Sequence, residues 1–157
     1  MKNQFLLKLN KKHLNALTWF LDNHNKIVSW PDKLNNGDIV CTKAKAIYKP
    51  AWTKYALSVY ETLASKYPDK APKYRSDGTW RYEYYQEGVG IADFEKHYVN
   101  IALNFCIADK IPVGVMRQVS PKPESRYKVL GIALPVYYNN GYFILEGFNK
   151  EGELHGN

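Results

Sequence analysis

The segment YPDKAPKYRSDGTWRYEYYQEGVG, residues 67–90, is rich in aromatic side chains, contains acids and is interrupted by Pro and Gly. Its prolines and the Asp77-Gly78 pair predict a loop in the first half. From Trp80 onward the rings of Trp80, Tyr82 and Tyr84 alternate with other side chains, which predicts a strand with these three rings on one face. The segment therefore predicts either a binding site or a core built from aromatic rings.

Both interpretations stay open on this segment alone. Exposed aromatic faces stack on planar ligands, and stacking on a nucleobase contributes about 1–3 kcal/mol per base. A carboxylate beside such a face can accept a hydrogen bond from the exocyclic amine of cytosine. The segment thus predicts a pocket for a base, and the alternative is that the same rings fill an ordinary β-sheet core.

The composition predicts a single globular domain with an anionic partner. The chain has 157 residues, of which 45% are hydrophobic and 24% charged, and such a balance is typical of a folded domain. The formal charge of +7 favours a polyanion as partner. Cys41 and Cys106 lack metal-ligand spacing, so a reducing, cytoplasmic setting is expected. No signal peptide, membrane span, metal or cofactor is predicted.

Working outward from the aromatic strand, hydrophobic periodicity predicts an α+β fold. The sheet is expected to be strongly curved or a partial β-barrel, with flanking helices. The Asn140-Gly141 pair predicts a hairpin, and Asn10 is expected to cap the first helix. The expected helices cover residues 11–24 and 93–105, and the expected strands lie within 52–63, 80–84, 111–119, 127–138 and 142–148.

Three parts of the chain are distinguished. Residues 1–37 are expected to form an N-terminal helical segment packed on the core, residues 38–148 the main domain, and residues 149–157 a frayed tail.

Catalytic motifs are not recognisable in this chain. No pair of histidines has metal-ligand spacing, and Pro68-Asp69 lacks the later acid followed two positions on by Lys that a nuclease core of the Pro-Asp type needs. Cys106 with His97 is one arrangement for nucleophilic catalysis. A buried, structural Cys106 is the favoured interpretation.

Two groups of segments, in their shared order, resemble a known family. The downstream group is NIALN (100–104), IPVGVMR (111–117), RYKVL (126–130) and GYFIL (141–145). The upstream group is KAIY (45–48), YALSV (55–59), YPD (67–69), YEY (82–84) and Gly88. Together they resemble the SET- and RING-associated (SRA) domain, of the bacterial type found in modification-dependent HNH restriction endonucleases. The resemblance covers roughly residues 38–148.

The resemblance implies a fold and a function. SRA domains have a PUA-like, curved sheet and bind duplex DNA that contains 5-methylcytosine or a related modified cytosine. They flip the modified base out between two aromatic rings, and an Asp reads its Watson–Crick edge. The chain would then be the non-enzymatic recognition module of a modification-dependent restriction system. Its partners would be modified duplex DNA and a fused or associated HNH nuclease, with no membrane.

The resemblance also implies roles for individual residues. The first ring corresponds to Tyr67, the reading carboxylate to Asp69 and the second ring to Tyr84, with Tyr82 or Trp80 as alternatives. The walls of the base pocket correspond to Ala64, Ser65 and Lys66 on one side and to Ala46 and Ile47 on the other. The phosphate contacts correspond to Lys43, Lys45, Lys49 and Arg117.

The chain also departs from the family. The segment between the second ring and Asn100 is short, and the finger that reads the opposite strand in eukaryotic members is not recognisable. Recognition of the opposite strand is therefore not expected. Two rival classes remain: a PUA-like RNA-binding module, and an enzyme acting on a modified base with Asp69 or Asp77 facing the pocket.

Overall fold

The computed structural model describes residues 3–43, 46–63, 71–86 and 94–156, and the side chains of residues 94–97 are not described. The helices are α1 (Gln4–Leu7), α2 (Lys11–Asp22) and α3 (Phe94–Asp109). The strands are β1 (Ile27–Val28), β2 (Ile47–Tyr48), β3 (Ser58–Glu61), β4 (Lys73–Tyr74), β5 (Trp80–Tyr85), β6 (Val113–Ser120), β7 (Arg126–Asn139) and β8 (Tyr142–Gly147).

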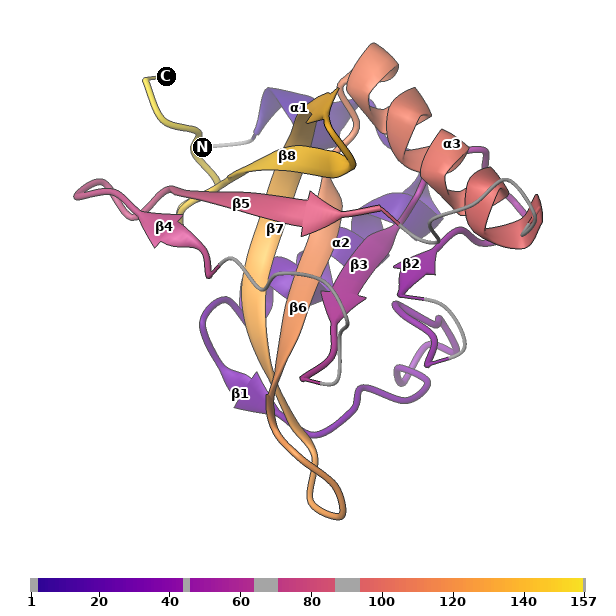
Figure 1. Cartoon of the computed structure of the whole chain (residues 1–157), viewed down its shortest axis with the longest axis vertical. Coiled ribbons are helices and arrows are strands. Elements are labelled where there is room, and N and C mark those ends of the chain that lie inside the picture. The colour runs from indigo at the N-terminus through magenta and orange to yellow at the C-terminus, as the bar shows by residue number, and fades with distance from the viewer. Residues whose placement is uncertain (1–2, 44–45, 64–70, 87–93, 157) are drawn as a thin grey trace.

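All eight described strands join one sheet, which makes the protein an α+β fold. The order is β2-β3-β6-β7-β8-β5-β4, and β1 pairs with one end of β7. Pairing is antiparallel except between β3 and β6, which run parallel. Figure 1 shows β5 and β8 crossing the direction of β6 and β7, so the sheet is strongly curved. It does not close into a barrel.

Strand β7 provides much of this curvature. Its register shifts against β6 between Val115 and Met116, and against β8 between Pro135 and Tyr137. Such bulges bend a strand and increase its local twist. Gly131, opposite Val115, has a φ of 118°, and a Cβ there would lie 2.5 Å from Nδ1 of His24. The bend therefore requires glycine at this position.

The two longer helices, α2 and α3, lie on opposite faces of the sheet (Figure 1). On one face α3 contributes Val99, Leu103 and Cys106 to a buried cluster that also contains the inward residues of β5 and β8. On the other face α2 contributes Leu17 and Phe20 to a second cluster against β6 and β7. The two clusters form the hydrophobic core on either side of the sheet.

Several sequence predictions are confirmed. Strand β5 alternates between buried and half-buried residues, with Trp80, Tyr82 and Tyr84 on the buried face. The hairpin of β7 and β8 turns at Asn140 and Gly141, which have φ values of 50° and 89°. Asn10 caps α2, because its side chain accepts a hydrogen bond from the backbone N–H of His13 at 2.9 Å.

Two predicted elements differ most from their expected bounds. The strand expected within residues 52–63 is limited to Ser58–Glu61. The backbone of Thr53 donates to Pro50 and its hydroxyl accepts from Tyr55 N–H, so this part forms turns instead. Helix α3 extends past residue 105 to Asp109 and ends at Lys110, which has a φ of 57°.

The two ends of the chain also differ from expectation. The N-terminal segment contributes residues of α2 to the second cluster, and it adds strand β1, which pairs with Tyr127 and Lys128 of β7, beyond the boundary expected at residue 38. Residues 149–156 are not frayed. Asn149 is buried, and its side-chain oxygen accepts a hydrogen bond from the backbone N–H of Glu153. Its side-chain amide donates to the carbonyl of Asp77 at 3.1 Å.

Among the described residues, none of the helices combines the length and the apolar character that crossing a membrane requires.

We predict that Gly114→Ala loosens the contact between α2 and the sheet. A Cβ at this position would lie 2.2 Å from Cδ2 of Phe20, and overpacking of this kind costs about 1–3 kcal/mol of unfolding free energy. Urea denaturation measures the loss. The double variant Gly114→Ala/Phe20→Leu should lose less than the sum of the single variants, because the smaller side chain relieves the clash. Strict additivity would contradict the predicted contact.

We predict that His13 makes the protein less stable in weak acid. Burial lowers the pKa of His13 from its ordinary value to about 4, and its Nε2 lies 3.3 Å from the carbonyl of Pro112. Because the folded-state pKa lies below the unfolded value, its contribution is complete above pH ~6.5 and is lost as the pH falls toward 4. His13→Leu should flatten unfolding free energy against pH in this window. An unchanged slope would refute this origin.

Candidate functional site

The centre of the candidate site is a hydrogen-bonded cluster that joins three strands. Tyr82 of β5 donates its hydroxyl to Oε1 of Glu61 at 2.6 Å, and Nε of Arg117 in β6 donates to the same oxygen at 3.1 Å. The Arg117 guanidinium carbon lies 5.7 Å from the centroid of the Tyr82 ring. We call Glu61, Tyr82 and Arg117 the β3–β5 brace.

The brace connects two strands that are distant in the sheet. Three strands, β6, β7 and β8, lie between β3 and β5 in the sheet order. A 2.6 Å hydrogen bond between Glu61 and Tyr82 is possible only because the sheet curves round until these strands face each other. Side chains thus bridge the gap that backbone hydrogen bonds leave open.

The charges of the brace are largely removed from water. The side chains of Arg117 and Glu61 are 20% and 11% exposed, and the Tyr82 residue is 1% exposed. A buried carboxylate needs hydrogen-bond donors and a countercharge, and Tyr82 and Arg117 supply them. Glu61 is therefore held as a paired acceptor, an arrangement suited to fixing strand positions.

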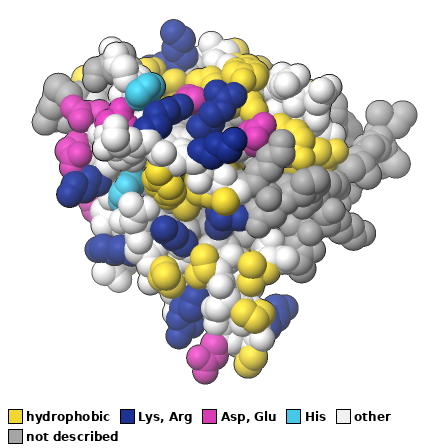
Figure 2. Space-filling view, turned by 60° about the vertical axis from the view of Figure 1, so that its left-hand side comes forward, with side chains coloured by type: hydrophobic (Ala, Val, Ile, Leu, Met, Phe, Trp, Pro, Cys, Tyr) yellow, Lys and Arg dark blue, Asp and Glu magenta, His cyan; other side chains and the backbone are white. Residues whose placement is uncertain are grey.

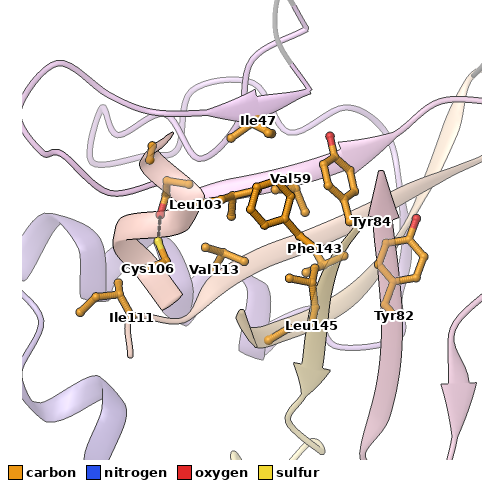
Figure 3. Close-up of a cluster of buried hydrophobic side chains, with 14 of the residues drawn as sticks. Ile47, Val59, Tyr82, Tyr84, Leu103, Cys106, Ile111, Val113, Phe143 and Leu145 are labelled. Atoms are coloured by element: carbon orange, nitrogen blue, oxygen red, sulfur yellow. Dashed lines mark hydrogen bonds between the residues drawn. The ribbon is translucent and has the colours of Figure 1, made fainter. Parts of the chain in front are cut away.

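The structure brings four predicted base-pocket residues into one place. Ile47, Tyr82 and Tyr84 belong to the same buried cluster, and Ala46 packs against it. Figure 3 shows Tyr82 and Tyr84 projecting from β5 on the same side of the strand, with ring centroids 6.5 Å apart. The predicted second wall of the pocket and the predicted second ring are thus neighbours in the fold.

The three candidate rings of β5 are all covered. Trp80 is fully buried and donates its indole N–H to the carbonyl of Phe148 at 3.1 Å. Tyr84 is 3% exposed. In this structure the three rings therefore fill the core of the sheet, which was the alternative to a base pocket. A base can reach Tyr84 only after the groups that cover this ring are displaced.

The remaining base-pocket residues lie outside the described part of the chain. They are Ala64, Ser65, Lys66, Tyr67 and Asp69. The chain enters this segment from Leu63, whose backbone N–H donates to Oε1 of Gln118 at 3.0 Å. Leu63, the last described residue before this segment, is therefore held to β6 next to Arg117.

The predicted phosphate contacts are divided among different surroundings. Arg117 was expected to meet phosphate, but it is paired with Glu61 inside the brace. Lys43 lies with its ammonium 5.5 Å from the Trp30 ring centroid, and Lys49 lies 4.9 Å from that of Tyr98. Lys45 is outside the described residues.

The residues weighed for catalysis have structural surroundings. Burial raises the pKa of Cys106 to about 12, so its thiol is protonated at neutral pH. Asp77 accepts hydrogen bonds from Thr79 and His155, which lower its pKa, and it shapes the turn before β5. Among the described residues there is no cluster of His, Cys, Asp and Glu suited to a metal ion.

Sequence reasoning missed Glu61. The only signal was an acid at the end of the apolar run Leu57–Tyr60, and acids are seldom buried unless they are paired. Its partners come from residues 21 and 56 positions later in the chain, so no local pattern identified them.

Comparison of the chain with protein-family models, with curated proteins and with solved structures gives no match.

We predict that Glu61→Ala strongly destabilises the fold. Removing the carboxylate takes away the countercharge that lies 3.1 Å from Nε of the largely buried Arg117, and breaking a buried ion pair costs about 3–5 kcal/mol. The comparison variant is Asp109→Ala, which removes the acid from an exposed pair with Lys54, where the cost is at most about 1 kcal/mol. Chemical denaturation measures both. Equal losses would show that the brace does not hold the sheet together.

Proposed function

We propose that this protein binds duplex DNA containing 5-methylcytosine or a related modified cytosine, and that it holds the modified base flipped out of the helix. In this proposal the fold is an SRA-like, PUA-like curved sheet. Tyr67 and Tyr84 stack on the base, Asp69 reads its Watson–Crick edge, and Ala46 and Ile47 form one wall. The nuclease of the restriction system would be a separate HNH domain or protein.

The Tyr82–Glu61 hydrogen bond supports this proposal most. It fixes the end of β3 beside β5 at 2.6 Å. Tyr67 follows Glu61 by six residues, which gives the chain a reach of at most about 20 Å. Tyr84 lies two residues along β5 from Tyr82, about 7 Å away. The segment with Tyr67 and Asp69 is therefore within reach of Tyr84.

Two further observations agree with the proposal. The fold is α+β with a strongly curved sheet, the class that the resemblance implies. The chain carries a formal charge of +7, and phosphate contacts dominate the affinity of DNA-binding proteins.

The free-energy cost of flipping the base out is similar to the free energy that stacking returns. Extruding a base costs a few kcal/mol, and stacking on two rings returns about 1–3 kcal/mol for each ring. Burying the methyl group adds only about 0.8 kcal/mol, which corresponds to about a fourfold preference. Because Tyr84 is 3% exposed, entry of the base also requires displacement of the groups that cover this ring.

We predict that Tyr67→Ala removes the preference for modified cytosine. Wild type should bind a duplex with one central 5-methylcytosine several-fold more tightly than the unmodified duplex, as measured by fluorescence anisotropy. Tyr67→Ala should bind both equally because it lacks one stacking face, and Tyr67→Phe, which keeps the ring, should retain most of the preference. Lys45→Ala should weaken both complexes alike and lower the salt slope by about 0.9.

A second measurement tests base flipping directly. A 2-aminopurine next to the modified cytosine should brighten when wild type binds, since extrusion of its neighbour unstacks it, and should not brighten with Tyr67→Ala. Equal affinity of wild type for both duplexes would sink the proposal. Tighter binding to a structured RNA of the same length would favour the PUA-like RNA-binding class instead, and loss of the modified base from the product would indicate an enzyme.

A further inference from the structure

A cleft with an aromatic floor lies on the opposite side of β3 from the brace. Trp30, Tyr60 and Tyr127 meet there edge to face, with ring centroids 5.1 Å apart for each Trp30 pair and 6.4 Å apart for the two tyrosines. Its volume is about 660 Å³. Trp30 is half-buried, while Tyr60 and Tyr127 are each 7% exposed, so the rings form a firm base for the cleft.

Positive charge surrounds this floor. Lys43, Lys122 and Arg126 line the cleft together with one acid, Glu124. Lys122 lies in the turn between β6 and β7, Arg126 is the first residue of β7, and both are exposed. Figure 2 shows Lys and Arg side chains on both sides of this hairpin, at the bottom of the molecule. Lys and Arg side chains gathered at one cleft can contact the phosphates of a nucleic acid.

Hydrogen bonds hold the walls of the cleft in place. The Tyr60 hydroxyl donates to the carbonyl of Lys43 at 3.0 Å. The Gln118 amide donates to the carbonyl of Ser120 at 3.1 Å and to the hydroxyl of Ser125 at 3.2 Å. The same Gln118 accepts from Leu63, the residue from which the chain enters the Tyr67 segment. The cleft and the start of that segment thus share one side chain.

The cleft and the brace also share strand β3. Successive side chains of a strand point to opposite faces. Glu61 accordingly meets Tyr82 on one face, whereas its neighbours Tyr60 and Thr62 line the cleft on the other. The cleft and the buried brace thus lie on opposite faces of the same strand.

We propose that this cleft is a second DNA contact, which holds the phosphate backbone of the duplex flanking the modified base. The inference rests on the proposed function and extends it. Lys122 and Arg126 neutralise phosphates, and Lys43 lies above Trp30 at the inner end of the cleft. The three aromatic rings exclude water beneath the DNA backbone. Contacts of this kind fix the position of the duplex without reading its sequence.

The experiment compares two double variants with the same loss of charge. Lys122→Ala/Arg126→Ala removes the outer cations of the cleft, and Lys11→Ala/Lys150→Ala removes two exposed cations elsewhere. Binding of methylated and unmodified duplexes is measured between 50 and 200 mM salt. The cleft variant should bind both duplexes about tenfold more weakly at low salt, with a salt slope smaller by about 1.8. The control should keep the wild-type slope.

The readouts separate failure of this inference from failure of the proposed function. If wild type prefers methylated DNA but both double variants have the same slope, the cleft does not contact DNA. Suppose that only the cleft variant has a smaller salt slope and that wild type binds methylated and unmodified DNA equally. The cleft then contacts DNA, and the base-pocket proposal is wrong. If Lys122→Ala/Arg126→Ala binds RNA more weakly than wild type does but binds duplex DNA equally well, the choice of DNA as the ligand of the cleft is wrong.

Tryptophan fluorescence gives a second readout of the cleft. Duplex binding should change the emission of the half-buried Trp30, and Trp30→Phe should abolish that change while keeping an aromatic floor. Persistence of the full change in Trp30→Phe would place the DNA away from the cleft.

Discussion

The curvature of the sheet depends on a buried carboxylate. Tyr82 and Arg117 both donate hydrogen bonds to Glu61 in the interior, and these partners come from two strands that backbone pairing does not bring next to each other. The bulges of β7 bend the sheet, and the brace fixes how far it bends. Since the proposed base pocket uses residues on both sides of this junction, its geometry follows from the same interaction.

The local structure was largely predictable from the sequence, and the long-range structure was not. Alternation in β5, the Asn140-Gly141 turn and the Asn10 cap are local signals, and each is confirmed. The parallel pairing of β3 with β6 and the attachment of β1 to β7 leave no local signal. The ordered turn at Asn149 was missed for the same reason, since a partner 72 residues earlier stabilises it.

Four residues that the sequence suggested for the base pocket lie together, but the sequence did not indicate that they are covered. Ala46, Ile47, Tyr82 and Tyr84 do meet in one cluster. Pattern reasoning indicated which face of β5 carries the rings, but their burial depends on the other members of the first cluster, which include residues of α3. Arg117 is a similar case. The sequence suggests an arginine exposed on a strand, and only the structure shows that it pairs with the largely buried Glu61.

The two ends of the described chain are tied together. The Asn3 amide donates to the carbonyl of Gly152 at 2.6 Å, and Figure 1 shows both ends on the same side of the molecule, away from the β6–β7 hairpin. A fluorophore or affinity handle attached near Asn3 or near Gly152 would therefore emerge from nearly the same point. The protein can accordingly be immobilised or labelled there with its hairpin and cleft left open to ligand.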